Sequence, residues 1–228
     1  MSPLQHTTPA GEDEAVAVQL RLREATVLDS SGPAPGLAGT LVAGVDVAYD
    51  DGRDLVVAAA VVLDAVTLTV VESATAARAV PFPYLPGLLA FRELPAVLDA
   101  LGALRHTPDL VVCDGYGVAH PRRFGLACHL GVLTGLPAIG VAKTPFLFRY
   151  GPPGPRRGDA APLLDGDEEV GRALRTRDGV KPVFVSAGHR TTLADACAHT
   201  LHLTTLGYRL PETTRAADRL CRQALRDA

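Results

Sequence analysis

The feature that most limits what this chain can fold into is a short apolar run that ends abruptly on an acid. Leu110–Cys113 reads as a buried strand, and Asp114 follows it directly. Gly115 and Gly117 then free the backbone for a sharp exit and for the close approach of a ligand. In an open α/β sheet, ligands gather outside the carboxyl ends of the strands. The segment therefore predicts an α/β sheet with a functional site at its edge.

Apolar periodicity and turn residues divide the rest of the chain into strands and helices. Strands are expected at residues 41–49, 55–63, 66–71, 110–113, 138–142, 170–175 and 181–185, with continuation of the third strand to residue 80 left open. Helices are expected at residues 12–28, 87–104, 124–134, 192–203 and 213–228. Turn signals at residues 50–52 and 178–179 indicate two hairpins. Three antiparallel strands followed by alternating helices and strands predict an α/β fold, with a mixed central β-sheet flanked by helices on both faces.

The length and composition fit a single α/β domain over residues 1–228. The 228 residues are 47% hydrophobic and 21% charged, enough to bury a full core. Residues 1–11 are expected to be disordered. Residues 151–158, rich in Gly, Pro and Arg, are expected to be irregular; disorder and contact with DNA both stay open for them.

No membrane segment is expected. The longest apolar stretches, such as residues 56–63, fall well short of a span of roughly 20 residues, and the N-terminus has neither a basic head nor an apolar signal core. The four cysteines form no CxxC pair and lie in segments that read as core, so we expect reduced, buried thiols. A cytoplasmic location is the corresponding expectation.

Four acids, distant in the sequence, are candidates for chemistry: Asp46, Glu93, Asp114 and Asp218. Asp46 interrupts an apolar strand, which is costly unless a charged partner meets it, although the solvated face of a half-exposed strand is an alternative. Glu93 and Asp218 lie on expected helices, where most acids are simply solvated. Two hard cations about 4 Å apart need several carboxylate oxygens, and such a pair can activate water and neutralise a phosphodiester.

Basic side chains follow the acid-tipped strand and indicate a phosphate ligand. His120, Arg122, Arg123 and Lys143 all come within about thirty residues of Asp114. Lys143 is one of two lysines in a chain that otherwise uses arginine, and a compact ammonium acts as a point charge beside phosphate. The net charge of −3 is not that of a typical nucleic-acid binder, but two divalent ions on the acids would make the total positive.

Six segments, in this order, resemble the endonuclease V family of deoxyinosine-specific repair nucleases. They are GVDVAY, PYLPGLLAFRE, DGYGVAHPRRFGLACH, GVAKT, FVSAGHRTTLADA and PETTRAADRL, and they cover nearly the whole chain. The resemblance implies a ribonuclease H-like fold, in which acids from two strands and two helices converge on metal ions.

The resemblance also implies roles for the candidate residues. Asp46 and Asp114 would be central metal ligands, Glu93 would complete the site, and Asp218 would bind a metal or orient the attacking water. Mg²⁺ is the implied metal, with Mn²⁺ as a substitute. His120 would hydrogen-bond near the metal-bound water or the attacked phosphate, with a structural core or loop histidine as the alternative. Lys143 would stabilise charge on the transferring phosphoryl group.

Substrate recognition, by the same resemblance, falls mostly to a wedge and to backbone groups. Tyr84, braced by prolines together with Leu85 and Pro86, would enter the base stack and fill the gap left by an extruded nucleotide. The extruded hypoxanthine would be read by main-chain groups near Gly87, Leu89, Gly115, Gly117 and Gly140. Ser186 and His189 are expected on a loop beside the cleft. Arg122, Arg123 and Arg149 would grip phosphates, with a solvated surface as the alternative for Arg149.

The function implied is a Mg²⁺-dependent endonuclease that cuts DNA at the second phosphodiester bond 3′ to deoxyinosine, leaving 3′-hydroxyl and 5′-phosphate ends. The expected partner is deoxyinosine-containing DNA, bound by a monomer. One alternative is a less selective ribonuclease H-like nuclease that acts on inosine-containing RNA or structured nucleic acid. Another is a catalytically silent nucleic-acid binding module.

Overall fold

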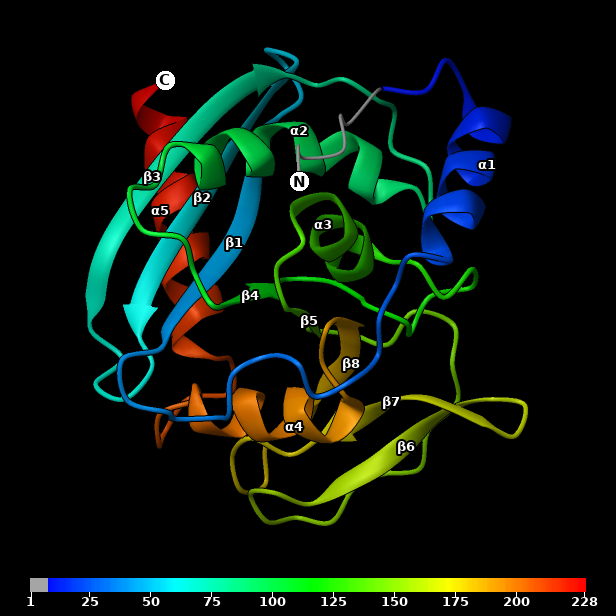
Figure 1. Cartoon of the computed structure of the whole chain (residues 1–228), viewed down its shortest axis with the longest axis vertical. Coiled ribbons are helices and arrows are strands. Elements are labelled where there is room, and N and C mark those ends of the chain that lie inside the picture. The colour runs from blue at the N-terminus through cyan, green and yellow to red at the C-terminus, as the bar shows by residue number, and fades with distance from the viewer. Residues whose placement is uncertain (1–7) are drawn as a thin grey trace.

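The computed structural model describes residues 8–228, which fold into helices on both sides of one β-sheet (Figure 1). The strands are β1 (Leu41–Asp50), β2 (Leu55–Asp64), β3 (Val70–Ala79), β4 (Leu110–Cys113), β5 (Ala138–Ala142), β6 (Ala160–Asp165), β7 (Glu168–Leu174) and β8 (Val183–His189). The helices are α1 (Glu12–Arg23), α2 (Leu89–Gly102), α3 (Leu126–Thr134), α4 (Leu193–His202) and α5 (Glu212–Asp227).

The sheet has eight strands in the order β3-β2-β1-β4-β5-β8-β7-β6. β1, β4 and β5 run parallel to one another, and the remaining neighbours are antiparallel. The parallel strands therefore lie in the middle of the sheet, where both faces are covered by helices. The expected mixed sheet is confirmed.

Helices α2 and α3 cover one face of the sheet, and α4 and α5 cover the other (Figure 1). Alternation along β1 separates the two cores. Ala43 and Val45 pack with Leu94 of α2, whereas Val42 packs with Ala196 of α4. Helix α1 lies outside these layers, against α3. The carboxyl ends of β1 and β4 thus emerge between the two helix layers.

The first helix is shorter than the sequence predicts. Helix α1 ends at Arg23 instead of residue 28, because the chain beyond it pairs with the end of β8. The amide of Val27 donates to Nδ1 of His189 (3.2 Å), and its carbonyl accepts from the amide of Arg190 (2.7 Å). Of the N-terminal segment expected to be disordered, residues 1–7 lie outside the described residues. Residues 8–11 lead directly into the helix, and the amide of Ala10 donates to Glu14.

The third strand begins later than expected and continues to residue 79. Residues 65–67 form a turn instead, because the side chain of Asp64 accepts hydrogen bonds from the amides of Val66 and Thr67. The sequence left open whether the third strand continues toward residue 80. It does, and β3 forms one edge of the sheet.

The predicted second hairpin is present, but one of its strands also pairs with a strand that the sequence did not predict. β7 does pair with β8, as expected around residues 178–179, but β7 also turns back onto β6, which the sequence did not predict. Pro162 interrupts the pattern of β6, and a proline is tolerated there because β6 is an edge strand. The segment before β6 is ordered, since Arg175 donates to the carbonyls of Pro153 and Gly154.

Two further expectations concern the cysteines and the membrane. All four cysteines are buried free thiols, as predicted. Within residues 8–228, no helix combines the length and apolar character that crossing a membrane requires.

Candidate functional site

Asp46 and Asp114 are neighbours on two parallel strands, because Asp46 lies within β1 and Asp114 directly follows β4. β1 and β4 are parallel, and Val45 lies opposite Cys113 in their last register pair. Each acid directly follows that pair, and adjacent strands lie about 4.8 Å apart. The strand-tip position predicted for Asp114 is therefore correct, and Asp46 stands beside it.

The other two acids come from helices on opposite faces of the sheet. Glu93 lies in the first turns of α2, and Asp218 lies on α5, which packs along β1. Gly44 permits this close packing, because a Cβ at that position would lie 2.3 Å from the carbonyl oxygen of Thr213. The four acids that these elements bring near one another are called the acid cluster: Asp46, Glu93, Asp114 and Asp218.

The acids of this cluster disfavour one another's ionisation. Burial, then the charge of Asp114, raises the pKa of Asp46 to about 7, and Asp218 adds to the rise. Burial, then the charge of Asp46, raises the pKa of Glu93 to about 8. Only 7% of Glu93 is exposed. Carboxylates that repel one another in a low-dielectric site form a place where cations bind favourably.

Lys143 supplies a cation to the acid cluster. It follows β5, and its Nζ donates to Oδ2 of Asp114 in an ion pair. Burial lowers the pKa of Lys143, but the hydrogen bond to Asp114 and the charges of Asp46 and Asp218 outweigh it and raise the pKa above its usual value. The ammonium therefore stays charged beside the acids.

Tyr49 and Arg92 hold the side of the cluster that faces α2. The hydroxyl of Tyr49 donates to Oε1 of Glu93 (3.3 Å). The guanidinium of Arg92 lies 4.5 Å from the centre of the Tyr49 ring, and it donates to the carbonyl of Phe82 and to Asp51. Glu93 is thus oriented by a neighbour that is itself fixed by a cation–π contact.

The donors of the acid cluster fit a hard divalent cation. Four carboxylates supply the oxygen ligands that Mg²⁺ and Mn²⁺ prefer. Among residues 8–228, however, no three or more His, Cys, Asp or Glu side chains already stand arranged to hold an ion. The oxygen of Asp114 instead faces the ammonium of Lys143, which stands in for positive charge at this point. The chemistry of the donors, rather than preformed coordination, supports a metal site.

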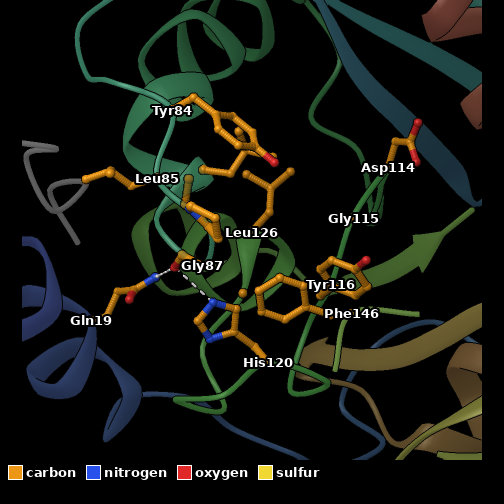
Figure 2. A pocket seen from close by; sticks show the side chains of 14 residues that line it. Gln19, Tyr84, Leu85, Gly87, Asp114, Gly115, Tyr116, His120, Leu126 and Phe146 are labelled. Carbon is orange, nitrogen blue, oxygen red and sulfur yellow. Dashed lines mark hydrogen bonds between the residues drawn. The ribbon is translucent and has the colours of Figure 1, made fainter. Parts of the chain in front are cut away.

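A pocket of about 220 Å³ lies next to the acid cluster. Figure 2 shows residues of the 84–87 loop facing side chains that follow β4 and β5. The pocket is lined by Gln19, Tyr84, Leu85, Pro86, Gly87, Leu89, Ala90, Asp114, Gly115, Tyr116, His120, Gly125, Leu126 and Phe146. Asp114 therefore belongs to both the pocket and the acid cluster.

The carbonyl of Gly87, a residue that lines this pocket, accepts hydrogen bonds from three side chains. It accepts hydrogen bonds from Nε2 of Gln19 (3.0 Å), Nε2 of His120 (2.9 Å) and Nη2 of Arg122 (2.8 Å). Figure 2 shows Gln19 and His120 reaching it from opposite sides. These four residues are called the Gly87 network below.

His120, predicted near the metal-bound water or the attacked phosphate, lines the pocket and hydrogen-bonds the 84–87 loop. A carbonyl only accepts, so Nε2 carries the proton toward Gly87, and Nδ1 accepts from the amide of Arg122 (3.2 Å). Burial, then the nearby arginines, lowers the pKa of His120 to about 4. The ring also stacks on Phe146, with centroids 6.0 Å apart. The neutral imidazole therefore braces the pocket, the structural alternative that the sequence left open.

Two of the glycines predicted to approach the base serve packing instead. A Cβ at position 117 would lie 1.9 Å from the carbonyl oxygen of Ala187, and one at position 140 would lie 2.5 Å from the amide of Gly117. Neither residue lines the pocket, whereas Gly87 and Gly115 do. Gly117 and Gly140 thus let the loop after β4 lie flat across β5 and β8.

Ser186 and His189 lie within strand β8 and are buried, so the prediction that they stand on a loop beside the cleft is wrong. The alternating apolar residues of β8 simply continue through them. The hydroxyl of Ser186 accepts from the amide of Gly117 (2.8 Å), and His189 accepts from the amide of Val27. Both side chains hold neighbouring segments in place.

The three arginines predicted to grip phosphates differ in their surroundings. Arg122 points inward to the Gly87 network. Arg123 forms ion pairs with Asp165 and Glu168 at the β6–β7 turn. Arg149 is exposed, and its backbone pairs with that of Leu164. Arg149 is the most exposed of the three, since Arg122 and Arg123 are partly buried.

Sequence reasoning missed several residues of the site: Gln19, Tyr49, Arg92, Tyr116 and Phe146. Gln19 carried a usable signal, because it lies four residues after Ala15 and so falls on the buried stripe of α1. Phe146 and Tyr116 lie in loops, where periodicity says nothing about burial. Their approach depends on how β4 and β5 are placed in the sheet.

Comparison with known proteins identifies one family along the chain. The family model of endonuclease V matches residues 21–219. An endonuclease V of Streptomyces avermitilis is 69% identical over 220 residues, which cover 96% of this chain and 95% of that protein. An endonuclease V of Nocardia farcinica is 59% identical over 228 residues, which cover 100% and 98%.

Solved structures agree with the sequence relatives. The crystal structure of the Streptomyces avermitilis endonuclease V aligns with a TM-score of 0.93 at 67% identity, covering 99% of this chain and 98% of that one. Endonuclease V of Ciona intestinalis, in complex with a 24mer DNA containing an inosine followed by a ribo-adenosine, aligns with a TM-score of 0.82 at 28% identity, covering 94% and 98%. The expected ribonuclease H-like α/β fold is confirmed. The chain belongs to the endonuclease V family and is an endonuclease that acts on phosphodiester bonds.

Proposed function

We propose that this chain is a Mg²⁺-dependent DNA repair endonuclease that recognises deoxyinosine and hydrolyses the second phosphodiester bond on its 3′ side, leaving 3′-hydroxyl and 5′-phosphate ends. The observation that carries the proposal is the position of Asp114, which belongs to the acid cluster and also lines the pocket. A base held in the pocket would place its own strand across the acids. The inosine-containing DNA bound by the Ciona intestinalis relative supports this substrate.

The wedge proposed for strand opening is Tyr84. Its side chain is 68% exposed, and Pro83 and Pro86 stiffen the loop that carries it. A rigid aromatic ring can enter a base stack and fill the place of an extruded nucleotide. The aromatic rings of Tyr116 and Phe146 line the opposite side of the pocket, and their centroids lie 5.4 Å apart. They offer flat surfaces on which an extruded base would stack.

Asp46 and Asp114 would hold the metal, with Glu93 completing the site and Asp218 binding a metal or orienting the attacking water. When bound, two Mg²⁺ ions would neutralise the phosphodiester and promote ionisation of water. Lys143 would release Asp114 to the metal and place its ammonium on the phosphate, where negative charge develops during the reaction. Tyr49 would keep Glu93 oriented throughout.

An Mg²⁺-dependent nicking assay with mapped product ends tests the proposal. A duplex with one deoxyinosine should be cut one nucleotide beyond the lesion, and a matched guanine duplex should stay intact. Asp46→Asn and Asp114→Asn should each lower the single-turnover nicking rate by about 10³-fold or more while binding survives, because catalysis without the metal loses its main electrostatic term.

The control for these variants is Asp54→Asn, an exposed acid in the β1–β2 turn, which should cut at the wild-type rate. Retained nicking by both Asp46→Asn and Asp114→Asn would refute the proposed site. Cutting at another bond would refute only the position of cleavage.

Inosine in RNA is a second candidate substrate, and one observation favours it. The DNA bound by the Ciona intestinalis relative carries a ribo-adenosine directly after the inosine, so that protein accommodates a ribose on the 3′ side. Cleavage of matched inosine oligonucleotides in DNA, in RNA and with a single ribonucleotide would rank the two candidates. A catalytically silent binding module is disfavoured, because four mutually repelling acids are costly without a catalytic metal.

A further inference from the structure

We infer that Gln19 of helix α1 is a positioning residue of the base pocket, so that the N-terminal helix takes part in selecting the base. The inference rests on the proposed function, because it concerns the pocket that would hold the extruded base. It adds a role for a helix that lies outside both layers of the sheet.

Gln19 is a polar side chain with every contact made inside the protein. It is 0% exposed. Its Nε2 donates to the carbonyls of Gly87 (3.0 Å) and Phe124 (3.3 Å), and its Oε1 accepts from Nε of Arg122. A buried amide is costly unless it is fully hydrogen-bonded, and this one joins the 84–87 loop, Arg122 and the start of α3.

Packing provides a second, independent link between α1 and the pocket. Ala15 of α1 is buried in one cluster with Phe82, Leu88 and Phe91, and Leu85 packs against the same cluster. Helix α1 therefore backs the loop that carries Tyr84. A shift of α1 would move this loop relative to Asp114 on the other side of the pocket.

The Gly87 carbonyl shows what Gln19 helps to control. Gly87 has φ +82°, and a Cβ there would lie 2.9 Å from Nη2 of Arg122, so the loop turns tightly at this point. Three donors reach the carbonyl, which has two lone pairs. It is therefore saturated and offers no acceptor to a bound base.

A pocket in which the Gly87 carbonyl has no free lone pair would bind hypoxanthine more tightly than guanine. The proposal places the C2 edge of the bound base against this carbonyl. The exocyclic amino group that distinguishes guanine from hypoxanthine would find no acceptor there and would lose binding free energy. Gln19 contributes to this discrimination in two ways, by donating to the carbonyl and by fixing Arg122 so that it donates as well. The family model begins at residue 21, so this contribution comes from a part of the chain outside the matched segment.

The test compares base discrimination in Gln19→Leu, Gln19→Glu and the wild type. Leucine removes all three hydrogen bonds, and glutamate keeps the acceptor for Arg122 but turns an oxygen toward the Gly87 and Phe124 carbonyls. Fluorescence anisotropy, with a labelled duplex carrying one deoxyinosine or guanine at the same position, gives the ratio of the two affinities. We expect this ratio to fall by about 10-fold in both variants, the equivalent of one buried hydrogen bond.

Two further readouts separate positioning from general damage. Arg21→Ala, on the exposed side of the same helix, should keep the wild-type ratio. The nicking rate at saturating inosine duplex is measured for the same variants, so that a loss of turnover is seen separately from a loss of base discrimination. An unchanged affinity ratio, or a fall in saturating rate with the ratio intact, would overturn the role of Gln19.

Hydrogen exchange of the wild-type protein keeps the inference testable if the variants fold poorly. The inosine duplex should protect amides of α1 and of residues 87–89 more than the guanine duplex does, and equal protection would overturn the inference. A wild-type protein that fails to prefer inosine over guanine would instead refute the proposed function. The two failures are therefore distinguishable.

Discussion

At the scale of single residues, Asp114 joins the acid cluster to the pocket, and Gln19 holds the loop on another side of the same pocket. Asp114 was predictable, because an acid directly after a buried strand and before two glycines has a known place at a sheet edge. Gln19 was not singled out, since its partners Gly87 and Phe124 lie 68 and 105 residues away along the chain. The helical spacing from Ala15 indicates that Gln19 is buried, but its hydrogen-bond partners are set by segments far away in the chain.

Tyr49→Phe tests whether the hydroxyl of Tyr49 orients Glu93 for metal binding. Removing the hydrogen bond leaves the buried carboxylate free to rotate, and residues that orient metal ligands typically change metal affinity by tenfold or more. Because the bond is long at 3.3 Å, we expect the Mg²⁺ concentration for half-maximal nicking to rise by about 3- to 10-fold. The measurement is an Mg²⁺ titration of the single-turnover rate.

The maximal nicking rate of Tyr49→Phe at saturating Mg²⁺ should stay within about threefold of the wild type, because the proposed role of Tyr49 is to orient Glu93 and not to contact the substrate. Tyr150→Phe, at a tyrosine that is 40% exposed, is the matched control and should leave the titration unchanged. An unshifted Mg²⁺ midpoint in Tyr49→Phe would remove the orienting role.

At the scale of elements, residues 151–158 form a brace and not a loose insertion. The guanidinium of Arg157 donates to the carbonyls of Thr176, Leu201 and Thr204. Leu201 lies in the last turn of α4 and Thr204 shortly follows the helix, where a cation is favourable for the helix dipole. One arginine thus joins the segment before β6 to the helix that covers β8.

Arg157→Ala should lower the free energy of unfolding by about 2 kcal/mol, because hydrogen bonds from a charged donor contribute about 1.5–3 kcal/mol and this side chain is only half-buried. Urea denaturation measures the change. Arg156→Ala, with an exposed neighbouring side chain, should change stability by less than about 0.5 kcal/mol. Equal effects of the two substitutions would contradict the brace.

The elements that the sequence predicted well are those with unbroken periodicity. Strands β1, β2, β4 and β5 and the last two helices appear close to their expected bounds. The errors arise where tertiary contacts override local pattern. Helix α1 stops early to pair with the end of β8, and β6 accepts Pro162 because it lies at the sheet edge. Long-range pairing of this kind has no signature in a short window of sequence.

At the scale of the whole molecule, the acid cluster makes stability depend on pH and metal. The folded-state pKa values of Asp46 and Glu93, about 7 and about 8, lie above those of unfolded acids. Their stabilising effect is therefore complete below the unfolded values and is lost as pH rises through the folded ones. In EDTA we expect the free energy of unfolding to fall by about 2–3 kcal/mol between about pH 6.5 and 8.5.

The measurement is urea denaturation across this pH range, in which His120 of the folded protein stays neutral. Glu93→Gln should lose less than half as much stability as the wild type, since the neutral amide has no proton to release. Glu24→Gln, at an exposed position, should behave as the wild type does. Added Mg²⁺ should flatten the wild-type curve, and a slope of the opposite sign in EDTA would contradict the repulsion among the acids.

The ion pair between Lys143 and Asp114 makes the reactivity of the Lys143 amine depend on whether the site is occupied. The chain has two lysines, Lys143 and Lys181, so an amine-selective acylating reagent has two side-chain targets whose labelled peptides are easily told apart by mass. A protonated amine held by a carboxylate acylates slowly, because the reagent attacks only the neutral form. A ligand that binds the Asp114 oxygen breaks this ion pair and changes the acylation rate of Lys143. The ratio of labelling at Lys143 to labelling at Lys181 therefore reports site occupancy without a cleavage assay.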